Sequence, residues 1–137
     1  MEIVKGLVYA FVVADILHTG HLNLLREAKK LGNYLVVGIL TDEAINYKPK
    51  PVMPFEERRQ IIESIKCVDL VVRQDSRDPT PNLKILHPQY LVHGDDWKEI
   101  PGSDYIKSIG GKAIKIPYFK YTRISSGEIK ERIRNNQ

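Results

Sequence analysis

Hydrophobic positions along this chain form two kinds of pattern, which alternate from one end to the other. Short continuous apolar runs rich in β-branched residues predict strands over residues 6–13, 34–40, 68–72, 90–93 and 112–116. Apolar residues at helical spacing predict helices over residues 21–31, 42–47, 55–66, 81–86, 103–109 and 126–133. This alternation is typical of βαβ units. We therefore expect an α/β, Rossmann-like fold with a doubly wound, parallel, five-stranded sheet and helices on both faces.

Length and composition predict one globular domain over residues 1–137, because no repeat, linker or low-complexity segment divides the chain. The sequence is 42% hydrophobic and 28% charged, and no apolar run approaches the roughly 20 residues of a membrane-spanning helix. Met1 opens directly into the first strand without a signal-peptide pattern, and Cys67 is the only cysteine. We therefore expect a cytoplasmic protein without an internal disulfide and without a membrane partner.

The formal net charge of +4 suits a ligand that carries phosphate, although a solvated surface of lysine and arginine explains the excess equally well. Nucleic-acid-binding proteins usually concentrate basic residues and interleave them with aromatic ones. No stretch of this chain does so. Nucleic acid is therefore not an expected partner.

The junction between the first strand and the first helix carries the most informative residues. The apolar run ends at Asp15, and His18 and His21 then flank Gly20 at the start of the helical pattern. Backbone N–H groups and the helix dipole favour an anion at such a place, and imidazoles can donate hydrogen bonds to it. A histidine here can equally be a capping or surface residue. Zinc is disfavoured, because Cys67 lies in a different helical pattern.

Three further stretches combine a structural interpretation with a functional one. Residues 46–54 form a proline-rich, basic loop, whose Lys48 and Lys50 are either surface residues or phosphate ligands. The glycine turn at residues 94–97 carries two adjacent acids and the only tryptophan, and the acids either cap a turn or bind something. Ser125 and Glu128 form a capping-box pattern at the start of the last helix, which also makes a second anion site.

Together these motifs resemble the HxGH nucleotidyltransferases, the superfamily of cytidylyltransferases and small adenylyltransferases. Asp15 and the sequence His-Thr-Gly-His at residues 18–21 together resemble the superfamily signature. Gly-Asp-Asp-Trp after a short strand is similar to the glycerol-3-phosphate, phosphoethanolamine and phosphonate cytidylyltransferases. The sequence Ile-Ser-Ser at residues 124–126 is similar to the third family motif.

The chain departs from the family pattern in two places. Arg123 and Gly127 stand where the family has glycine and threonine. Phe11 and its neighbours stand where the family places a glycine close to phosphate, so a bulky ring is expected to narrow the pocket.

The resemblance implies roles for individual residues. By this resemblance, the catalytic residues are His18, His21 and Lys48. Nucleotide contacts fall to Val13, Ala14, Gly20, Lys50, Gly94, Asp96, Ile124, Ser125 and Ser126. Acceptor contacts fall to Asp15, Arg58, Lys66, Trp97, Lys120 and Arg123. Asp15 would orient a histidine or the acceptor, and Arg58 and Lys66 would face the substrate or a neighbouring subunit.

The resemblance also implies the reaction. CMP would pass from CTP to a small acceptor that bears a phosphate or phosphonate, with Mg²⁺ on the triphosphate and pyrophosphate as the leaving group. 2-Aminoethylphosphonate, glycerol 3-phosphate, phosphoethanolamine and phosphocholine are the expected acceptors. Two alternatives stay open: an adenylyltransferase for a riboflavin- or pantetheine-type acceptor, and a nucleotide sensor without turnover. Members of the family are often dimeric, so a homodimer is expected.

Overall fold

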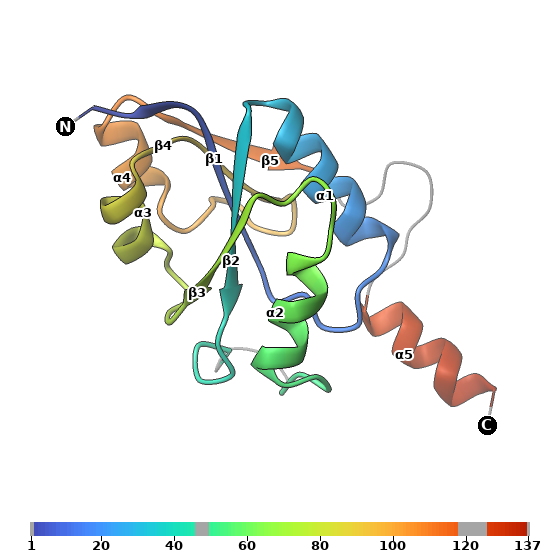
Figure 1. Cartoon of the computed structure of the whole chain (residues 1–137). Coiled ribbons are helices and arrows are strands. Elements are labelled where there is room, and N and C mark those ends of the chain that lie inside the picture. The colour runs from blue at the N-terminus through green and yellow to red at the C-terminus, as the bar shows by residue number, and fades with distance from the viewer. Residues whose placement is uncertain (1, 46–49, 118–125, 137) are drawn as a thin grey trace.

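A computed structural model describes residues 2–45, 50–117 and 126–136, and within them the chain folds around one sheet of five parallel strands (Figure 1). The elements follow in the order β1 (Val4–Val12), α1 (Thr19–Lys30), β2 (Tyr34–Leu40), α2 (Phe55–Glu63), β3 (Leu70–Gln74), α3 (Thr80–Leu86), β4 (Pro88–Gly94), α4 (Ser103–Ser108), β5 (Lys112–Ile116) and α5 (Ser126–Asn135). The α/β, Rossmann-like fold predicted from the alternating pattern is confirmed.

The strand order β3-β2-β1-β4-β5 places β1 at the centre of the sheet. The chain moves outward from β1 through β2 to β3 and then returns to add β4 and β5 on the other side of β1. The order therefore reverses between β1 and β4. In doubly wound sheets, ligands bind beyond the carboxyl ends of the strands at such a reversal.

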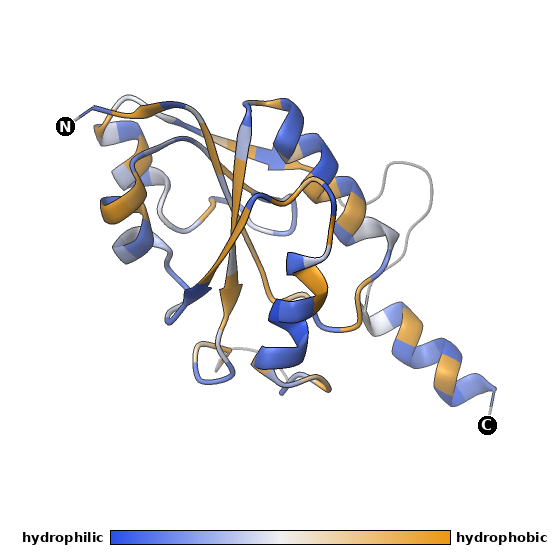
Figure 2. Ribbon diagram, viewed as in Figure 1, coloured by the Kyte–Doolittle hydropathy of each residue, from blue (hydrophilic) through white to orange (hydrophobic). Residues whose placement is uncertain are grey.

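Two hydrophobic clusters fill the two faces of the sheet. Leu24, Leu25 and Ile62 bring α1 and α2 onto one face, and Leu83 and Ile106 bring α3 and α4 onto the other. Figure 1 shows the two helix pairs on opposite sides of the strands, and Figure 2 shows hydrophobic colour along the central strands. Because both faces are covered, β1 is one nearly continuous apolar run instead of an alternating one.

Several element boundaries differ from those expected. The helix predicted over residues 42–47 is wrong in its described part, where residues 42–44 form a turn closed by the Thr41 hydroxyl, which accepts the Ala44 N–H (3.3 Å). β3 begins and ends two residues later than the expected 68–72, and α2 ends at Glu63 instead of residue 66. None of the helices in the described ranges is both long and apolar enough to cross a bilayer.

Gly38 allows a buried polar cluster to form between β1 and its neighbours. The Tyr9 hydroxyl donates to Gln74 Oε1 (2.6 Å) and accepts from Asn82 Nδ2 (3.0 Å), and Tyr9 is fully buried. Burial raises the pKa of this hydroxyl well above its ordinary value, so the ring stays neutral. A Cβ at residue 38 would overlap the Tyr9 hydroxyl and lie 2.8 Å from Gln74 Oε1.

We predict that Gly38→Ala lowers the free energy of unfolding by about 1–3 kcal/mol, because the added methyl group overfills a packed site. Urea unfolding followed by circular dichroism measures the loss. The same change in a Tyr9→Phe background should cost less, since the hydroxyl that clashes is gone. An equal penalty in both backgrounds would show that the overlap with the Tyr9 hydroxyl is not the cause, because the ring carbon Cζ, 2.7 Å from the added Cβ, remains in phenylalanine.

Candidate functional site

The residues that follow β1 and β4 meet at the point where the strand order reverses. β1 and β4 pair up to Ala10 and Val92, so Val12 and Gly94 each lie two residues further along neighbouring strands. Val13, Ala14 and Asp15 follow β1, and His18, Gly20 and His21 begin α1. Asp96 and Trp97 follow β4. The structure therefore brings these predicted site residues to one edge of the sheet.

The loop between β1 and α1 has an unusual backbone. Ala14 has a φ of 61° and Ile16 has a φ of 54°, on either side of Asp15. Side chains rarely adopt this left-handed region, and a β-branched residue such as Ile16 is especially strained there. Strained backbone of this kind persists where the surrounding structure holds it, and it is concentrated at functional sites.

His18 and His21 cap α1 reciprocally through their ring nitrogens. The Gly20 N–H donates to His18 Nδ1 (3.0 Å), and the His18 N–H donates to His21 Nδ1 (3.2 Å). This arrangement is a capping box in which imidazoles replace the usual hydroxyl and carboxylate. The ring centroids lie only 4.0 Å apart.

These caps determine where each imidazole carries its proton. An Nδ1 that accepts a hydrogen bond is unprotonated, so the proton of the neutral ring sits on Nε2. Burial lowers the pKa of His18, which keeps the ring neutral at neutral pH. The stability that neutral His18 contributes is therefore present above the ordinary histidine pKa and is lost as the pH falls toward its lower folded value. In the neutral form of each ring, the N–H donor is therefore at Nε2.

Asp15 anchors a second segment of the chain to this loop. One carboxylate oxygen accepts the Val52 N–H (2.9 Å) and the other accepts the Met53 N–H (3.0 Å). Lys130 of α5 lies 3.2 Å from the same oxygen as Val52. Burial opposes ionisation of Asp15, but these hydrogen bonds and Lys130 outweigh it and hold the pKa of the carboxyl below its usual range. These contacts make Asp15 an anchor for Val52 and Met53, and its expected role of orienting a histidine or the acceptor stays a prediction.

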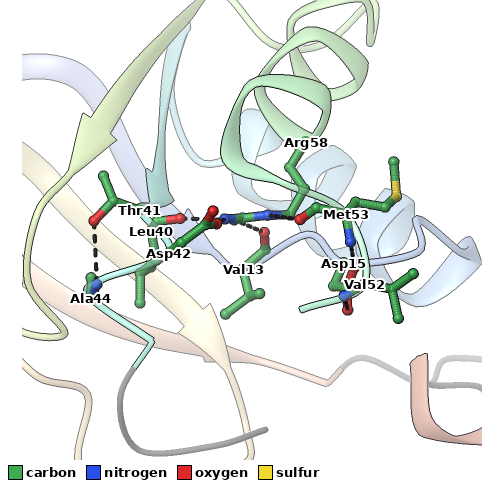
Figure 3. A network of polar contacts seen from close by, with 9 residues as sticks. All are labelled: Val13, Asp15, Leu40, Thr41, Asp42, Ala44, Val52, Met53 and Arg58. Carbon is green, nitrogen blue, oxygen red and sulfur yellow. Dashed lines mark hydrogen bonds and ion pairs between the residues drawn. The ribbon is translucent and has the colours of Figure 1, made fainter. Parts of the chain in front are cut away.

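Arg58 was expected to contact the acceptor, but its side chain lies in the interior of the protein. Its side chain is fully buried and donates to the carbonyls of Met53 (2.9 Å), Val13 (2.8 Å) and Leu40 (2.8 Å) (Figure 3). It also pairs with Asp42 at 2.5 Å. The expectation of a direct acceptor contact is therefore corrected: the guanidinium joins the ends of β1 and β2 to the chain before α2.

Lys66 lies toward the edge of the sheet opposite the histidines. α2 starts near the carboxyl ends of the strands and runs back across the sheet, and Lys66 follows it just before β3 begins. The helix spans nine residues, or about 13 Å, which carries Lys66 to the amino edge. This position does not favour a substrate contact, and both expected roles of Lys66, toward the substrate or toward a neighbouring subunit, stay predictions.

The turn after β4 gathers residues from distant parts of the chain. The buried His93 ring lies 4.5 Å from the Phe11 ring and 6.1 Å from the Trp97 ring. Its Nδ1 lies 3.4 Å from Asp96 Oδ1, and the Arg77 guanidinium lies 3.9 Å above Trp97. Phe11 therefore packs into the core against His93. Sequence analysis missed Arg77, because the loop that carries it follows β3, which β2 and β1 separate from β4 in the sheet.

Several predicted site residues lie outside the described residues: Lys48, Lys120, Arg123, Ile124 and Ser125. Ser126 begins α5, and exposed Lys50 follows the first gap. The described residues that flank these gaps are held close to the histidines. Asn23 of α1 donates to the Pro117 carbonyl (2.9 Å), and Lys130 pairs with Asp15.

We predict that NMR of ¹⁵N-labelled protein at neutral pH finds His18 and His21 in the Nε2–H tautomer. Long-range correlations between ring protons and nitrogens distinguish the tautomers directly. The physical reason is that both Nδ1 atoms accept backbone N–H groups. An Nδ1–H tautomer at either histidine would contradict the capping geometry.

Comparison with known proteins places the chain in a family. The chain matches the cytidylyltransferase-like family over residues 12–132. It is 44% identical over 82 residues to FAD synthase of Archaeoglobus fulgidus, covering 60% of each chain. It is 34% identical over 125 residues to the bifunctional protein HldE of Alcanivorax borkumensis, covering 88% of this chain and 26% of that protein.

A solved structure supports the same relationship. A lipopolysaccharide core biosynthesis protein from Thermoplasma volcanium superposes with a TM-score of 0.73 and 30% identity, covering 82% of this chain and 97% of that one. The chain spans 60% of the length of the archaeal FAD synthase and 26% of the length of HldE. Because the family match covers most of the sequence, the chain belongs to the cytidylyltransferase-like family of nucleotidyltransferases.

Proposed function

We propose that this protein transfers CMP from CTP to a small acceptor that bears a phosphate or phosphonate group, releasing pyrophosphate. The observation that carries the proposal is the pair of imidazoles at the start of α1, each with its Nδ1 occupied by a backbone N–H. Their Nε2–H groups can donate to phosphate oxygens beside the positive end of the helix dipole. The family match supports the same chemistry.

In the proposed reaction, an anionic oxygen of the acceptor attacks the α-phosphorus of CTP in line. The bond from that phosphorus to the oxygen bridging to the β-phosphate breaks, and pyrophosphate carries the electron pair away. Because the attacking oxygen is already ionised, no strong general base is required. Catalysis then depends on positioning and on stabilising the negative charge that spreads over the phosphoryl oxygens, as His18 and His21 would do.

Two other segments, one with lysines and one with serines, would complete the binding of the triphosphate. Lys50 and Lys48 would hold its outer phosphates, and the serines at the start of α5 would face the histidines. Support comes from the flanks of these segments: Val52 and Met53 bind Asp15, and Lys130, one helical turn after Ser126, lies 3.2 Å from the same carboxylate. Mg²⁺ would enter as part of the nucleotide substrate, on the triphosphate oxygens.

The acceptor is proposed from the motif after β4. Gly-Asp-Asp-Trp resembles the phosphonate and glycerol-phosphate cytidylyltransferases, and Arg77 above Trp97 adds a cation beside it. A second candidate is adenylyl transfer. The name of the archaeal relative, FAD synthase, denotes a product with an adenylyl group, and that relative is 44% identical over 82 residues. A homodimer and a cytoplasmic location stay predictions.

We predict that pyrophosphate release requires CTP together with a phosphate- or phosphonate-bearing acceptor. The assay pairs each common nucleoside triphosphate with 2-aminoethylphosphonate, glycerol 3-phosphate, phosphoethanolamine, phosphocholine and FMN. Turnover with ATP and FMN would replace cytidylyl transfer with adenylyl transfer. CTP binding without pyrophosphate release across the panel would favour a nucleotide sensor and contradict the proposed reaction.

We predict that His18→Ala and His21→Ala each lower kcat by about a hundredfold or more, as the loss of one charge-stabilising donor commonly does. His87→Asn is the matched control. His87 ends α3 at the amino edge of the sheet with a φ of 49°, which asparagine tolerates. Circular dichroism checks that all variants fold. Near-normal turnover in either His18→Ala or His21→Ala would remove that residue from the mechanism.

A further inference from the structure

Residues 50–54, which we term the anchored segment, are held through backbone groups of Val52 and Met53. Asp15 accepts the N–H groups of Val52 (2.9 Å) and Met53 (3.0 Å), and Arg58 Nε donates to the Met53 carbonyl (2.9 Å). Figure 3 shows Asp15 and Arg58 reaching Met53 from different sides. All three of these hydrogen bonds involve backbone groups of the segment. The Val52 side chain itself is exposed and does not hold the segment in place by burial.

The same arginine ties this segment to the ends of two central strands. Its guanidinium donates to the Val13 carbonyl, just after β1, and to the Leu40 carbonyl, at the end of β2. Asp42 pairs with it at 2.5 Å and balances its charge. A fully buried arginine is stable only with such partners, so removing one of them should disturb the others.

The anchored segment carries Lys50, and the undescribed residues 46–49 directly precede it. Two residues of extended chain reach at most about 7 Å, so fixing Val52 restricts where Lys50 can lie. Pro51 and Pro54 stiffen the segment further, because each fixes its own φ angle. The anchored segment is therefore restrained as a unit.

We propose that Asp15 and Arg58 are positioning residues, which hold the anchored segment at the carboxyl edge of the sheet so that its lysine faces the nucleotide phosphates. This inference rests on the proposed function and names how one part of its phosphate site is held. In this inference both residues act through backbone groups: Asp15 through the N–H groups of Val52 and Met53, and Arg58 through the Met53 carbonyl.

Lys130 makes Asp15 a junction of three elements. The same oxygen, Oδ2, accepts the Val52 N–H and lies 3.2 Å from Lys130 Nζ. Asp15 therefore restrains the β1–α1 loop, the anchored segment and α5 together. Asp15 thus contacts α5 and also holds the anchored segment, and two variants separate these roles. Lys130→Gln weakens only the contact with α5, whereas Asp15→Asn alters the hydrogen bonds to the backbone of Val52 and Met53.

The test compares amide exchange and nucleotide binding in the wild type, Asp15→Asn, Lys130→Gln and the exposed control Asp104→Asn. An asparagine can accept one of the two N–H groups, but its own NH₂ group then faces the other. We expect exchange at Val52 or Met53, measured by NMR without nucleotide, to rise about tenfold or more in Asp15→Asn. Lys130→Gln and Asp104→Asn should leave these amides near the wild-type rate.

Nucleotide affinity is the second measurement, because a purely structural role of Asp15 would not change it. In Asp15→Asn we expect the Kd for CTP, and the KM, to rise about tenfold, with a smaller change in kcat, because a binding segment is loosened. Arg58→Lys keeps the charge but loses the planar fork, and it should loosen the same amides if it folds. Asp15→Asn keeps the test decisive if Arg58→Lys does not fold.

Unchanged exchange at both amides, or faster exchange with unchanged CTP affinity, would overturn the inference. If wild-type protein binds neither CTP nor ATP, the proposed function fails. The positioning role toward a nucleotide then fails with it, while faster amide exchange in Asp15→Asn would still establish the anchor itself. The two failures are therefore distinguishable.

Discussion

The candidate site depends on two hydrogen bonds at the start of α1, in which backbone N–H groups donate to the Nδ1 atoms of His18 and His21. They satisfy backbone donors that every helix start leaves without an intrahelical partner, and they fix the tautomer of both rings. One arrangement would therefore serve both the stability of α1 and the proposed chemistry. The fold supplies the rest, because the centre of the sheet and the reversal of strand order both lie at β1.

A second layer of contacts holds the surroundings of the histidines. Asp15 and Arg58 are both buried, and both act on the backbone of segments that end at the carboxyl edge of the sheet. The burial of an aspartate and an arginine costs solvation, which dense hydrogen bonding offsets. The left-handed backbone at Ala14 and Ile16 adds conformational strain. This strain accompanies a short loop that must direct Asp15 toward Val52 and Met53 and also place His18 at the start of α1.

Sequence analysis predicted the fold well where local pattern and tertiary packing agree. β2 and β5 have the boundaries expected: Asn33 and Thr41 flank the apolar run of β2, and Gly111 and Pro117 flank β5. It failed where a contact comes from far along the chain. Arg58 follows Phe55 by three residues and precedes Ile62 by four, so it lies on the apolar stripe of α2, a signal that was available. Its partners Val13 and Leu40 could not be foreseen from periodicity. Arg77 reaches Trp97 only because the loops after β3 and β4 converge at one edge.

The most direct test is a crystal structure of the complex with CTP. It should place the Nε2 atoms of His18 and His21 within about 3 Å of oxygens on the α- or β-phosphate, with Nδ1 of each ring still facing its backbone N–H. A triphosphate bound elsewhere on the molecule, or rings turned so that Nδ1 meets the phosphate, would contradict the account.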